Sequence, residues 1–435
     1  MVKIVNMVNI ENKYTPALRF PDFLNDGEWE VKRLGEIAEK VTSKNKSNEQ
    51  LPVLTNSATE GVVNQQDYFD REIVTKDNLT NYHIIELNDF VYNPRISVAA
   101  PVGPISRNKI GTGIMSPLYT IFKFKEGNID FFEQYFRTNC WHQYLKDKAN
   151  FGARFDRMNI SNEDFFNLPI PFPPLSEQRR IAQVLTALDE LIAATNEKLE
   201  QMKVYKKGLM QQLFVDSMGG GKSLKINYLQ ITKLRFPEFY EEKEWEEKKL
   251  GEIVMRITDR NKENNQNVLT ISAQYGLVSQ YDYFNKNVAS ADVSNYYIIN
   301  KGDFAYNKSR SQGHPYGAIK SLRLYYKGIV SPLYICFRTK SDDFDCDFLE
   351  YYFDTDLIDG EISQIAQEGA INHGLLNIST TDFFDNVTIF VPTLPEQRKI
   401  ASCLSAMDET INAYTEKVGL LGQYKKGLMQ QMFVN

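Results

Sequence analysis

A long internal repeat constrains this sequence more than any other feature. Residues 18–21, Leu-Arg-Phe-Pro, return unchanged at 234–237, and residues 205–212, Tyr-Lys-Lys-Gly-Leu-Met-Gln-Gln, return letter for letter at 424–431. The spacing of about 216 residues is far longer than the roughly 20–45 residues of a solenoid unit. The sequence therefore predicts two homologous halves, each made of a domain followed by an appendage.

Each half has two textures. Residues 18–173 and 234–393 carry short β-type runs, many turn residues and scattered aromatics, which indicates a mixed α+β domain with short strands. After each domain, apolar residues recur every three or four positions, over 181–202 and 400–421, which indicates a long amphipathic helix. Ser176 is the expected N-cap of the first helix.

The length of these helices favours pairing. Residues 176–214 would extend about 58 Å as one helix, which is long for a helix inside a domain of this size. We expect the two helices to leave their domains and pack together as an antiparallel coiled coil; the alternative is a core helix inside each domain. The expected fold class is α+β, with two homologous mixed domains separated by the paired helices and related by pseudo-two-fold symmetry. The expected boundaries are 1–173 for the first domain, 174–216 for its helix, 217–392 for the second domain and 393–435 for its helix, with a glycine linker at 219–221.

The composition fits a soluble protein of the cytoplasm. The chain of 435 residues is 42% hydrophobic, yet no apolar run reaches the roughly 20 residues of a membrane span, and no secretion signal is recognisable near the N-terminus. Cysteines number four, without a Cys-x-x-Cys pair, and histidines also number four, which argues against disulfides and against a metal centre.

The net charge argues against a protein that binds DNA on its own. The chain has 50 Lys and Arg against 56 Asp and Glu, a formal charge of -6. Contacts to phosphates dominate DNA affinity and need basic residues. An acidic chain can still bind DNA if its charges are segregated, or if partner proteins supply part of the grip.

The two copies have diverged unevenly. The helix starts, Ser-Glu-Gln-Arg-Arg-Ile-Ala at 176–182 and Pro-Glu-Gln-Arg-Lys-Ile-Ala at 395–401, are nearly identical, while the middles of the domains differ widely. Parts that stayed alike are expected to do the same job twice, such as binding two copies of one partner. Parts that differ are expected to meet different targets. This pattern suits an asymmetric two-part DNA target, read by domains about 34 Å apart or somewhat more.

These blocks resemble one known family. Each helix opens Leu-x-Glu-Gln-Arg-x-Ile-Ala (175–182 and 394–401) and closes near Tyr-Lys-Lys-Gly-Leu-Met-Gln-Gln, and each domain contains Gly-Ile-x-Ser-Pro-Leu-Tyr (113–119 and 328–334). Together they are similar to the specificity subunit of type I restriction–modification systems, over about 18–435. The resemblance implies that each domain is a target recognition domain that reads one half of a split DNA sequence.

The resemblance also implies partners and cofactors. The paired helices would dock two modification subunits, which bind S-adenosylmethionine and methylate adenine N6. Two restriction subunits would use ATP and Mg²⁺ to translocate and cut double-stranded DNA. This chain would itself hold no cofactor, metal or catalytic residue. No Asn-Pro-Pro-Tyr or Asp-Pro-Pro-Tyr tetrapeptide of an adenine methyltransferase is present in the sequence.

Residues that contact DNA should lie in the diverged loops. Arg and Lys recognise guanine, Asn and Gln recognise adenine, and basic residues bind the surrounding phosphates. The candidates are Arg95, Ser97, Arg107, Arg154 and Arg157 in the first domain, and Lys308, Arg310, Gln312, His314 and Arg323 in the second. Each of them alone could equally be a solvated surface charge.

Residues that contact partner subunits should lie in the repeated helix blocks, because these blocks have stayed alike. The candidates are Glu177, Gln178, Arg179, Tyr205, Lys206, Lys207, Glu396, Gln397, Arg398, Tyr424, Lys425 and Lys426.

Two other functions remain open. Carboxylates near a lysine occur in both halves and could hold Mg²⁺ beside a phosphate, as in a stand-alone nuclease; the simpler interpretation is a charged surface segment. These residues are Asp22, Glu30 and Lys32, and Glu238, Glu246 and Lys248. The other alternative is a coiled-coil scaffold without DNA specificity.

Overall fold

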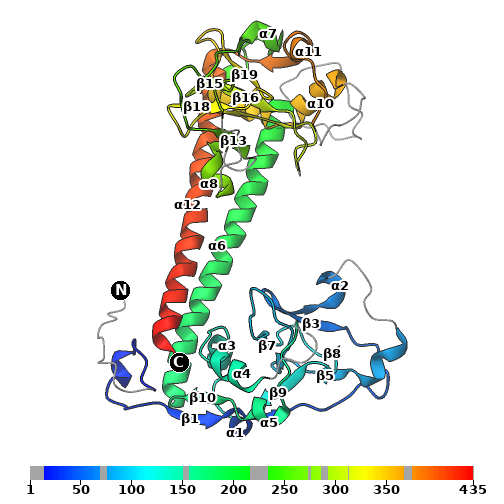
Figure 1. Ribbon diagram of the computed structural model, residues 1–435, viewed down its shortest axis with the longest axis vertical. Coiled ribbons are helices and arrows are strands. Elements are labelled where there is room, and N and C mark those ends of the chain that lie inside the picture. The colour runs from blue at the N-terminus through cyan, green and yellow to red at the C-terminus, as the bar shows by residue number, and fades with distance from the viewer. Residues whose placement is uncertain are drawn as a thin grey trace. The chain divides into compact units, whose positions relative to one another are not determined.

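The chain divides into two compact units. A computed structural model describes residues 14–68, 76–149, 156–215, 234–272, 276–285, 292–311, 313–366 and 375–434. Unit 1 comprises residues 1–196 and 416–435, and unit 2 comprises residues 197–415. Each unit therefore holds one copy of the repeated domain together with parts of both long helices (Figure 1). The expected glycine linker lies outside the described residues.

The domain of unit 1 is built from short elements. They are η1 (Pro21–Phe23), β1 (Glu30–Arg33), α1 (Leu34–Ile37), β2 (Ala38–Lys40), β3 (Leu54–Ser57), β4 (Gly61–Asn64), α2 (Gln65–Tyr68), η2 (Lys76–Asn81), β5 (His83–Ile85), β6 (Phe90–Tyr92), β7 (Ile105–Arg107), β8 (Gly113–Met115), β9 (Thr120–Phe124), α3 (Ile129–Phe136), α4 (His142–Lys148), α5 (Asn162–Phe166) and β10 (Pro169–Phe172).

The domain of unit 2 repeats this order. Its elements are η3 (Pro237–Phe239), β11 (Glu246–Lys249), α7 (Leu250–Ile253), β12 (Val254–Ile257), β13 (Leu269–Ser272), β14 (Gly276–Ser279), α8 (Gln280–Phe284), β15 (Tyr297–Asn300), β16 (Phe304–Asn307), β17 (Ala318–Ser321), β18 (Lys327–Val330), β19 (Ile335–Thr339), α9 (Cys346–Phe353), α10 (Asp356–Ile365), α11 (Thr380–Asp385) and β20 (Thr388–Val391).

Both domains share one sheet topology. A four-stranded antiparallel sheet has the order β2-β9-β6-β7 in unit 1 and β12-β19-β16-β17 in unit 2. The register also repeats, because Phe90 lies opposite Phe122 and Arg107, as Phe304 lies opposite Phe337 and Ser321. The expected α+β class with two homologous mixed domains is confirmed.

Aromatic side chains fill the core beneath each sheet. In unit 1 the ring of Phe124 stacks on Phe132 with 3.9 Å between centroids, and Phe132 is fully buried. Helix α3 begins at this core because the Asn128 side chain accepts a hydrogen bond from the Phe131 N–H. Burying one such aromatic side chain contributes roughly 1.5–3 kcal/mol, so the core fixes the strands that carry the loops.

Two long helices link the repeats. Helix α6 (Leu175–Val215) has 41 residues and α12 (Leu394–Met432) has 39. Helix α6 begins one residue earlier than expected, because the Glu177 N–H already donates to the Pro174 carbonyl at 2.9 Å. Ser176 therefore lies in the first turn and is not the N-cap.

The helices run antiparallel to each other within each unit. In unit 1, Asp189 of α6 accepts a hydrogen bond from Lys425 of α12 at 2.6 Å. In unit 2, Lys206 of α6 donates to Asp408 of α12, also at 2.6 Å. Lys206 and Lys425 occupy the same place in the repeated block, so one ion pair is formed twice with the roles of the helices exchanged.

Each helix belongs to both repeats. The first turns of α6 bury Ile181 in the domain core of unit 1, while Phe214 near its end packs among the aromatics of unit 2, with ring centroids 5.6 Å from Phe348. Phe433, just after α12, packs 5.4 Å from Phe131 in unit 1. The alternative of a helix enclosed in its own domain is thus correct only for the first turns.

Among the residues that the structure describes, no helix combines the length and apolar character needed to cross a membrane.

Candidate nucleic-acid interface

A buried ion pair holds the segment before each domain to the start of the following helix. In unit 1, Arg19 donates two hydrogen bonds of 2.7 Å to the Glu177 carboxylate, and the Trp29 indole N–H donates a third at 3.1 Å. In unit 2, Arg235 donates to Glu396 at 2.8 and 2.7 Å. The repeated Leu-Arg-Phe-Pro and Glu-Gln-Arg blocks are therefore structural partners of each other.

This arrangement changes the role expected for four of the partner-binding candidates. The side chains of Glu177, Gln178, Glu396 and Gln397 are at most 1% exposed. Gln178 accepts from the Asn128 N–H and Gln397 accepts from the Asp345 N–H, each at 2.8 Å, within their own units. Because their burial leaves no surface for a partner, these residues join the helix to its domain instead.

The loop between β6 and β7 is closed tightly in unit 1. The Tyr92 hydroxyl donates to the Val102 carbonyl at 2.9 Å, and the Asn93 side chain accepts from the Arg95 N–H at 3.0 Å. Gly103 has φ +81°, and a Cβ there would lie 2.1 Å from the Asn93 carbonyl oxygen. Only glycine fits this close approach, so the ends of the loop are pinned while its middle is left to vary.

The β16–β17 loop of unit 2 is closed in the same way. Tyr306 donates to the Tyr316 carbonyl at 2.7 Å, the Asn307 side chain accepts from the Ser309 N–H at 3.1 Å, and Gly317 has φ +84°. The frame of the loop is therefore common to both units, whereas the residues that it carries are different.

A cavity of about 420 Å³ lies beside the unit 1 loop, which we call the loop cavity. Its polar and aromatic lining includes Thr55, Asn56, Ser57, Tyr68, Tyr82, Arg95, Ser97, Ser116, Tyr119 and Arg157. Three DNA-binding candidates, Arg95, Ser97 and Arg157, thus meet in one place. Guanidinium, hydroxyl and aromatic groups together suit the base edges and phosphates of DNA.

Two of these candidates are directly paired through the backbone. Arg95 and Arg157 form an isolated antiparallel β-bridge, which brings residues far apart in sequence side by side. The Arg95 side chain is 62% exposed, and its one ion pair among the described residues is a 3.5 Å contact with Asp156. Such an exposed ion pair is weak, so the Arg95 guanidinium can exchange it for a ligand.

Sequence reasoning missed the polar wall of the loop cavity. The Tyr119 hydroxyl lies 3.0 Å from the Thr55 hydroxyl, and Ser57 donates to the Tyr68 hydroxyl at 3.2 Å. In unit 2, Tyr334 and Thr270 repeat the first contact at 3.5 Å. The repeated Ser-Pro-Leu-Tyr motif was the available signal, since it places a tyrosine at the same position of both domains.

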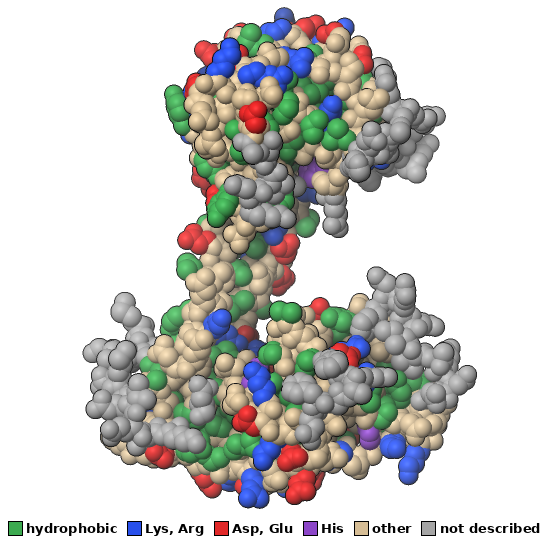
Figure 2. All heavy atoms as spheres, viewed as in Figure 1, with side chains coloured by type: hydrophobic (Ala, Val, Ile, Leu, Met, Phe, Trp, Pro, Cys, Tyr) green, Lys and Arg blue, Asp and Glu red, His purple; other side chains and the backbone are tan. Residues whose placement is uncertain are grey.

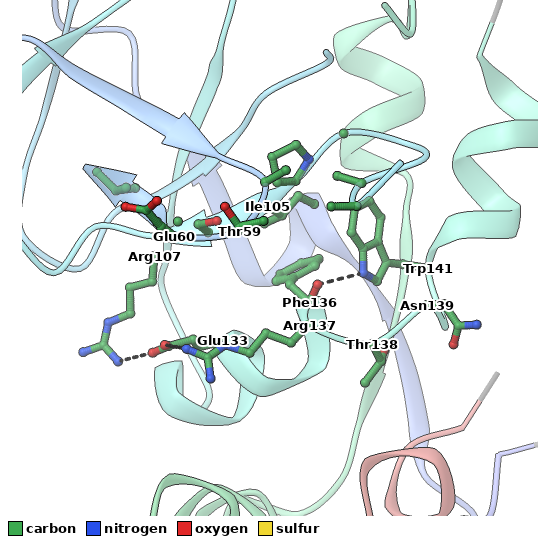
Figure 3. Close-up of a pocket in the computed structure, with 18 of the residues that line it drawn as sticks. Thr59, Glu60, Ile105, Arg107, Glu133, Phe136, Arg137, Thr138, Asn139 and Trp141 are labelled. Atoms are coloured by element: carbon green, nitrogen blue, oxygen red, sulfur yellow. Dashed lines mark hydrogen bonds and ion pairs between the residues drawn. The ribbon is translucent and has the colours of Figure 1, made fainter. Parts of the chain in front are cut away.

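A second cavity, of about 580 Å³, is lined by Gly103, Arg107 and Glu133 among others (Figure 3). Arg107, Lys109 and Arg137 all pair with the Glu133 carboxylate, at 3.3, 2.7 and 2.8 Å. Arg107 also pairs with Asp130 at 2.5 Å, and its side chain is only 13% exposed. The structure therefore separates Arg107 from the Arg95 group and gives its charge internal partners.

The unit 2 candidates divide into two places. Lys308, Arg310 and His314 lie on the β16–β17 loop, and burial lowers the pKa of Lys308. Arg310 is exposed, whereas Arg323 pairs with Glu350 at 2.7 Å and with Asp347 at 2.9 Å on α9. Two further candidates, Arg154 and Gln312, lie outside the described residues. All ten DNA contacts stay predictions.

Of the eight remaining partner-binding candidates, six are exposed, three in each unit. Lys206 and Lys425 are taken by the ion pairs between the helices, whereas six others are exposed. Unit 1 presents Arg179, Tyr424 and Lys426, and unit 2 presents Arg398, Tyr205 and Lys207. Because the helices are antiparallel, each unit shows one helix start beside one helix end, and the same residue types recur.

Two of the four carboxylates considered for a nuclease are engaged with lysines. Glu246 pairs with Lys248 at 2.7 Å, and Glu238 pairs with Lys399 at 3.0 Å. Lys32 pairs with Glu126 at 2.9 Å and not with the acidic residues near it in sequence. Within the described part of the chain, no group of three or more His, Cys, Asp or Glu could hold a metal ion.

Charge is mixed over the visible surface. Figure 2 shows Lys and Arg interspersed with Asp and Glu on this face of each unit. Basic side chains therefore occur in local groups, such as the Arg95–Arg157 pair, on a chain whose overall charge is negative.

Comparison with known proteins identifies the family. The sequence model of the type I restriction modification DNA specificity domain matches residues 26–204 and again 242–419. The type I restriction enzyme MjaVIII specificity subunit of Methanocaldococcus jannaschii is 28% identical over 58% of this chain and 55% of its own length. The putative MjaX specificity subunit of the same organism is 24% identical over 72% of this chain and 65% of its own.

A solved structure shares the fold. The type I restriction–modification S subunit from M. genitalium is 14% identical, with a TM-score of 0.52 over 94% of this chain and 97% of that one. The alignments span little more than half to just under two thirds of the curated relatives. Since the family match covers both halves and most of the sequence, the chain belongs to the type I restriction modification DNA specificity domain family.

Proposed function

We propose that this chain is the DNA sequence-recognition subunit of a type I restriction–modification complex. Its two domains read the two unlike halves of one split target on double-stranded DNA. It carries out no chemistry itself. Adenine-N6 methylation and DNA cleavage are the work of modification and restriction subunits docked on it.

One observation carries this proposal: the same loop frame presents different side chains in the two units. Tyrosine, asparagine and glycine pin the β6–β7 and β16–β17 loops in the same way, while Arg95 and Ile96 of one loop are matched by Ser309 and Arg310 at the equivalent positions of the other. A frame kept constant with a variable reading surface suits two different base sequences, because base edges carry the sequence information.

The equal exposed sets on the helices support two copies of one partner. Unit 1 also has an apolar groove of about 330 Å³, lined in part by Phe20, Leu188, Tyr424 and Leu428. An exposed apolar groove edged by basic and aromatic residues is typical of a protein-binding surface. We assign it to a modification subunit, with the equivalent surface of unit 2 taking the second copy.

The proposal places the cofactors on the partners. S-adenosylmethionine would bind the modification subunits, and ATP with Mg²⁺ the restriction subunits. The described cysteines are free thiols. Free thiols are compatible with the cytoplasm, where this chain would bind the DNA of the host.

A selection experiment tests the function. The full chain is co-purified with the modification subunit encoded beside it, for which we expect an Asn-Pro-Pro-Tyr-type motif, and used to select from a pool of random-sequence duplex DNA. We expect a motif in two specific parts separated by an unread gap, and methylated adenines at that motif in the host genome only when this chain is present. Weak binding without any motif would favour the scaffold alternative, and cleavage by the purified chain alone would favour the nuclease.

A further inference from the structure

We propose that four positions determine specificity, one on each loop and one on the segment bridged to it. This inference rests on the proposed function. Arg95 and Arg157 read guanine in the half-site bound by unit 1. Their structural equivalents, Ser309 and Leu375, leave the half-site of unit 2 without a guanine contact at the same place.

The equivalence follows from three repeated backbone contacts. Arg95 bridges Arg157 as Ser309 bridges Leu375, each as an isolated antiparallel pair. The N–H groups of Arg95 and Ser309 both donate to the side chain of the asparagine two positions before them. One residue beyond the bridge, the Met158 N–H donates to the Pro94 carbonyl at 2.9 Å, and the Leu376 N–H donates to the Lys308 carbonyl at 3.0 Å. Since these contacts superimpose the positions, the difference lies in the side chains alone.

The side chains at the bridge differ in what they can recognise. A guanidinium donates two parallel hydrogen bonds to N7 and O6 of guanine, the most frequent base-specific contact. Ser309 is too short for this and Leu375 offers only apolar contact, of the kind that fits a thymine methyl group. The unit 1 pair therefore selects guanine where the unit 2 pair cannot.

The surroundings leave the unit 1 pair available. Arg95 and Arg157 both line the loop cavity, and Arg95 is mostly exposed with one long ion pair to Asp156. Arg107, by contrast, is enclosed by Asp130 and Glu133 in the other cavity. Among the described residues, Arg95 and Arg157 are the basic side chains that line the loop cavity.

The test transfers the unit 2 residues into unit 1. The complex of the full chain with its modification subunits selects from random-sequence duplex DNA, as wild type and as R95S/R157L. We expect the variant to lose its preference for guanine in one half of the motif and to keep the other half unchanged. Affinity for the best wild-type site should fall about 5- to 150-fold for each arginine lost. The reciprocal S309R/L375R variant should gain a guanine preference in the other half.

A matched control separates base recognition from charge. R33S/K123S also removes two positive charges from unit 1, and neither residue lines the loop cavity. We expect this control to keep the motif, with affinity lowered equally for all sequences. R95K/R157K keeps the charge but replaces each planar guanidinium by a single ammonium group, so it should weaken the guanine preference with a smaller loss of affinity than R95S/R157L causes, even if R95S/R157L folds poorly.

The outcomes distinguish the inference from the proposed function. If the wild-type complex selects no motif, the proposed function is wrong. If the wild type selects a two-part motif and both arginine variants keep its guanine preference unchanged, the function stands and the assignment of these positions is overturned.

Discussion

Removing the buried carboxylate of Glu177 should destabilise unit 1 more than the equivalent change destabilises unit 2. Glu177→Leu leaves the Arg19 guanidinium, whose side chain is 2% exposed, without its counter-charge. Breaking a buried ion pair from one side costs about 3–5 kcal/mol. The change also leaves the Trp29 indole N–H without its 3.1 Å acceptor, which adds about 1–3 kcal/mol.

Glu396→Leu is the matched comparison. It breaks the same pair with Arg235, but the indole N–H of Trp245 is already buried without a hydrogen-bond partner among the described residues. We therefore expect Glu396→Leu to cost less than Glu177→Leu by about 1–3 kcal/mol. Both losses are large beside the roughly 5–15 kcal/mol that stabilise a whole domain.

Hydrogen exchange is the suitable assay. A chain of two units does not unfold in one step, and exchange of the peptides around residues 18–33 and 234–249 reports local opening in each unit separately. Replacing both partners, as in R19M/E177L, should recover most of the loss, because no buried charge remains. A single variant within 1 kcal/mol of wild type, or a double variant as unstable as the single one, would refute the reasoning.

Three smaller predictions concern pH and glycine. Burial raises the pKa of Asp189, but hydrogen bonds including that from Lys425 outweigh burial and hold the pKa below its usual value. The resulting stability is present above the unfolded pKa of about 4 and is lost as the pH falls through the pKa of the folded state. Hydrogen exchange from unit 1 should therefore accelerate below about pH 4 in the wild type and depend less on pH in Asp189→Asn. Gly103→Ala should open the β6–β7 loop, because its Cβ would meet the Asn93 carbonyl at φ +81°; a change of at least about 1 kcal/mol in loop exchange is expected, with weaker DNA binding. A Cβ at Gly419, in an exposed part of α12, would meet nothing within 4 Å. Gly419→Ala should therefore raise the free energy of local helix opening by about 1 kcal/mol and slow hydrogen exchange there. Faster exchange in the variant would contradict this.

The fold was predictable because the same sequence blocks occur in both halves of the chain. The repeated blocks gave the two domains, and the spacing of apolar residues over 181–202 gave a helix in the right place. The same spacing could not say what the helix packs against, since it marks a buried face and not its partner. The exchange of Phe214 and Phe433 between the repeats was therefore beyond the sequence.

The candidate site was predictable only in part. Loop arginines such as Arg95 and Arg157 were chosen for their chemistry, and the structure brings these two together at one bridge. Arg107 has the same chemistry, but three-dimensional neighbours neutralise it. Glu177 reads as a surface residue at a helix start, and its burial became visible only with Arg19 beside it. The sequence identifies a charged residue but does not show which side chains pair with it in the folded protein.

The crossing of the helix ends has a consequence for biosynthesis. Phe433 completes the aromatic core of the domain that is translated first, while Phe214 is ready for the other domain before that domain exists. The core of the first domain therefore stays incomplete during synthesis until the last turns of α12 have been made. A premature stop within those turns would therefore destabilise the domain that is translated first.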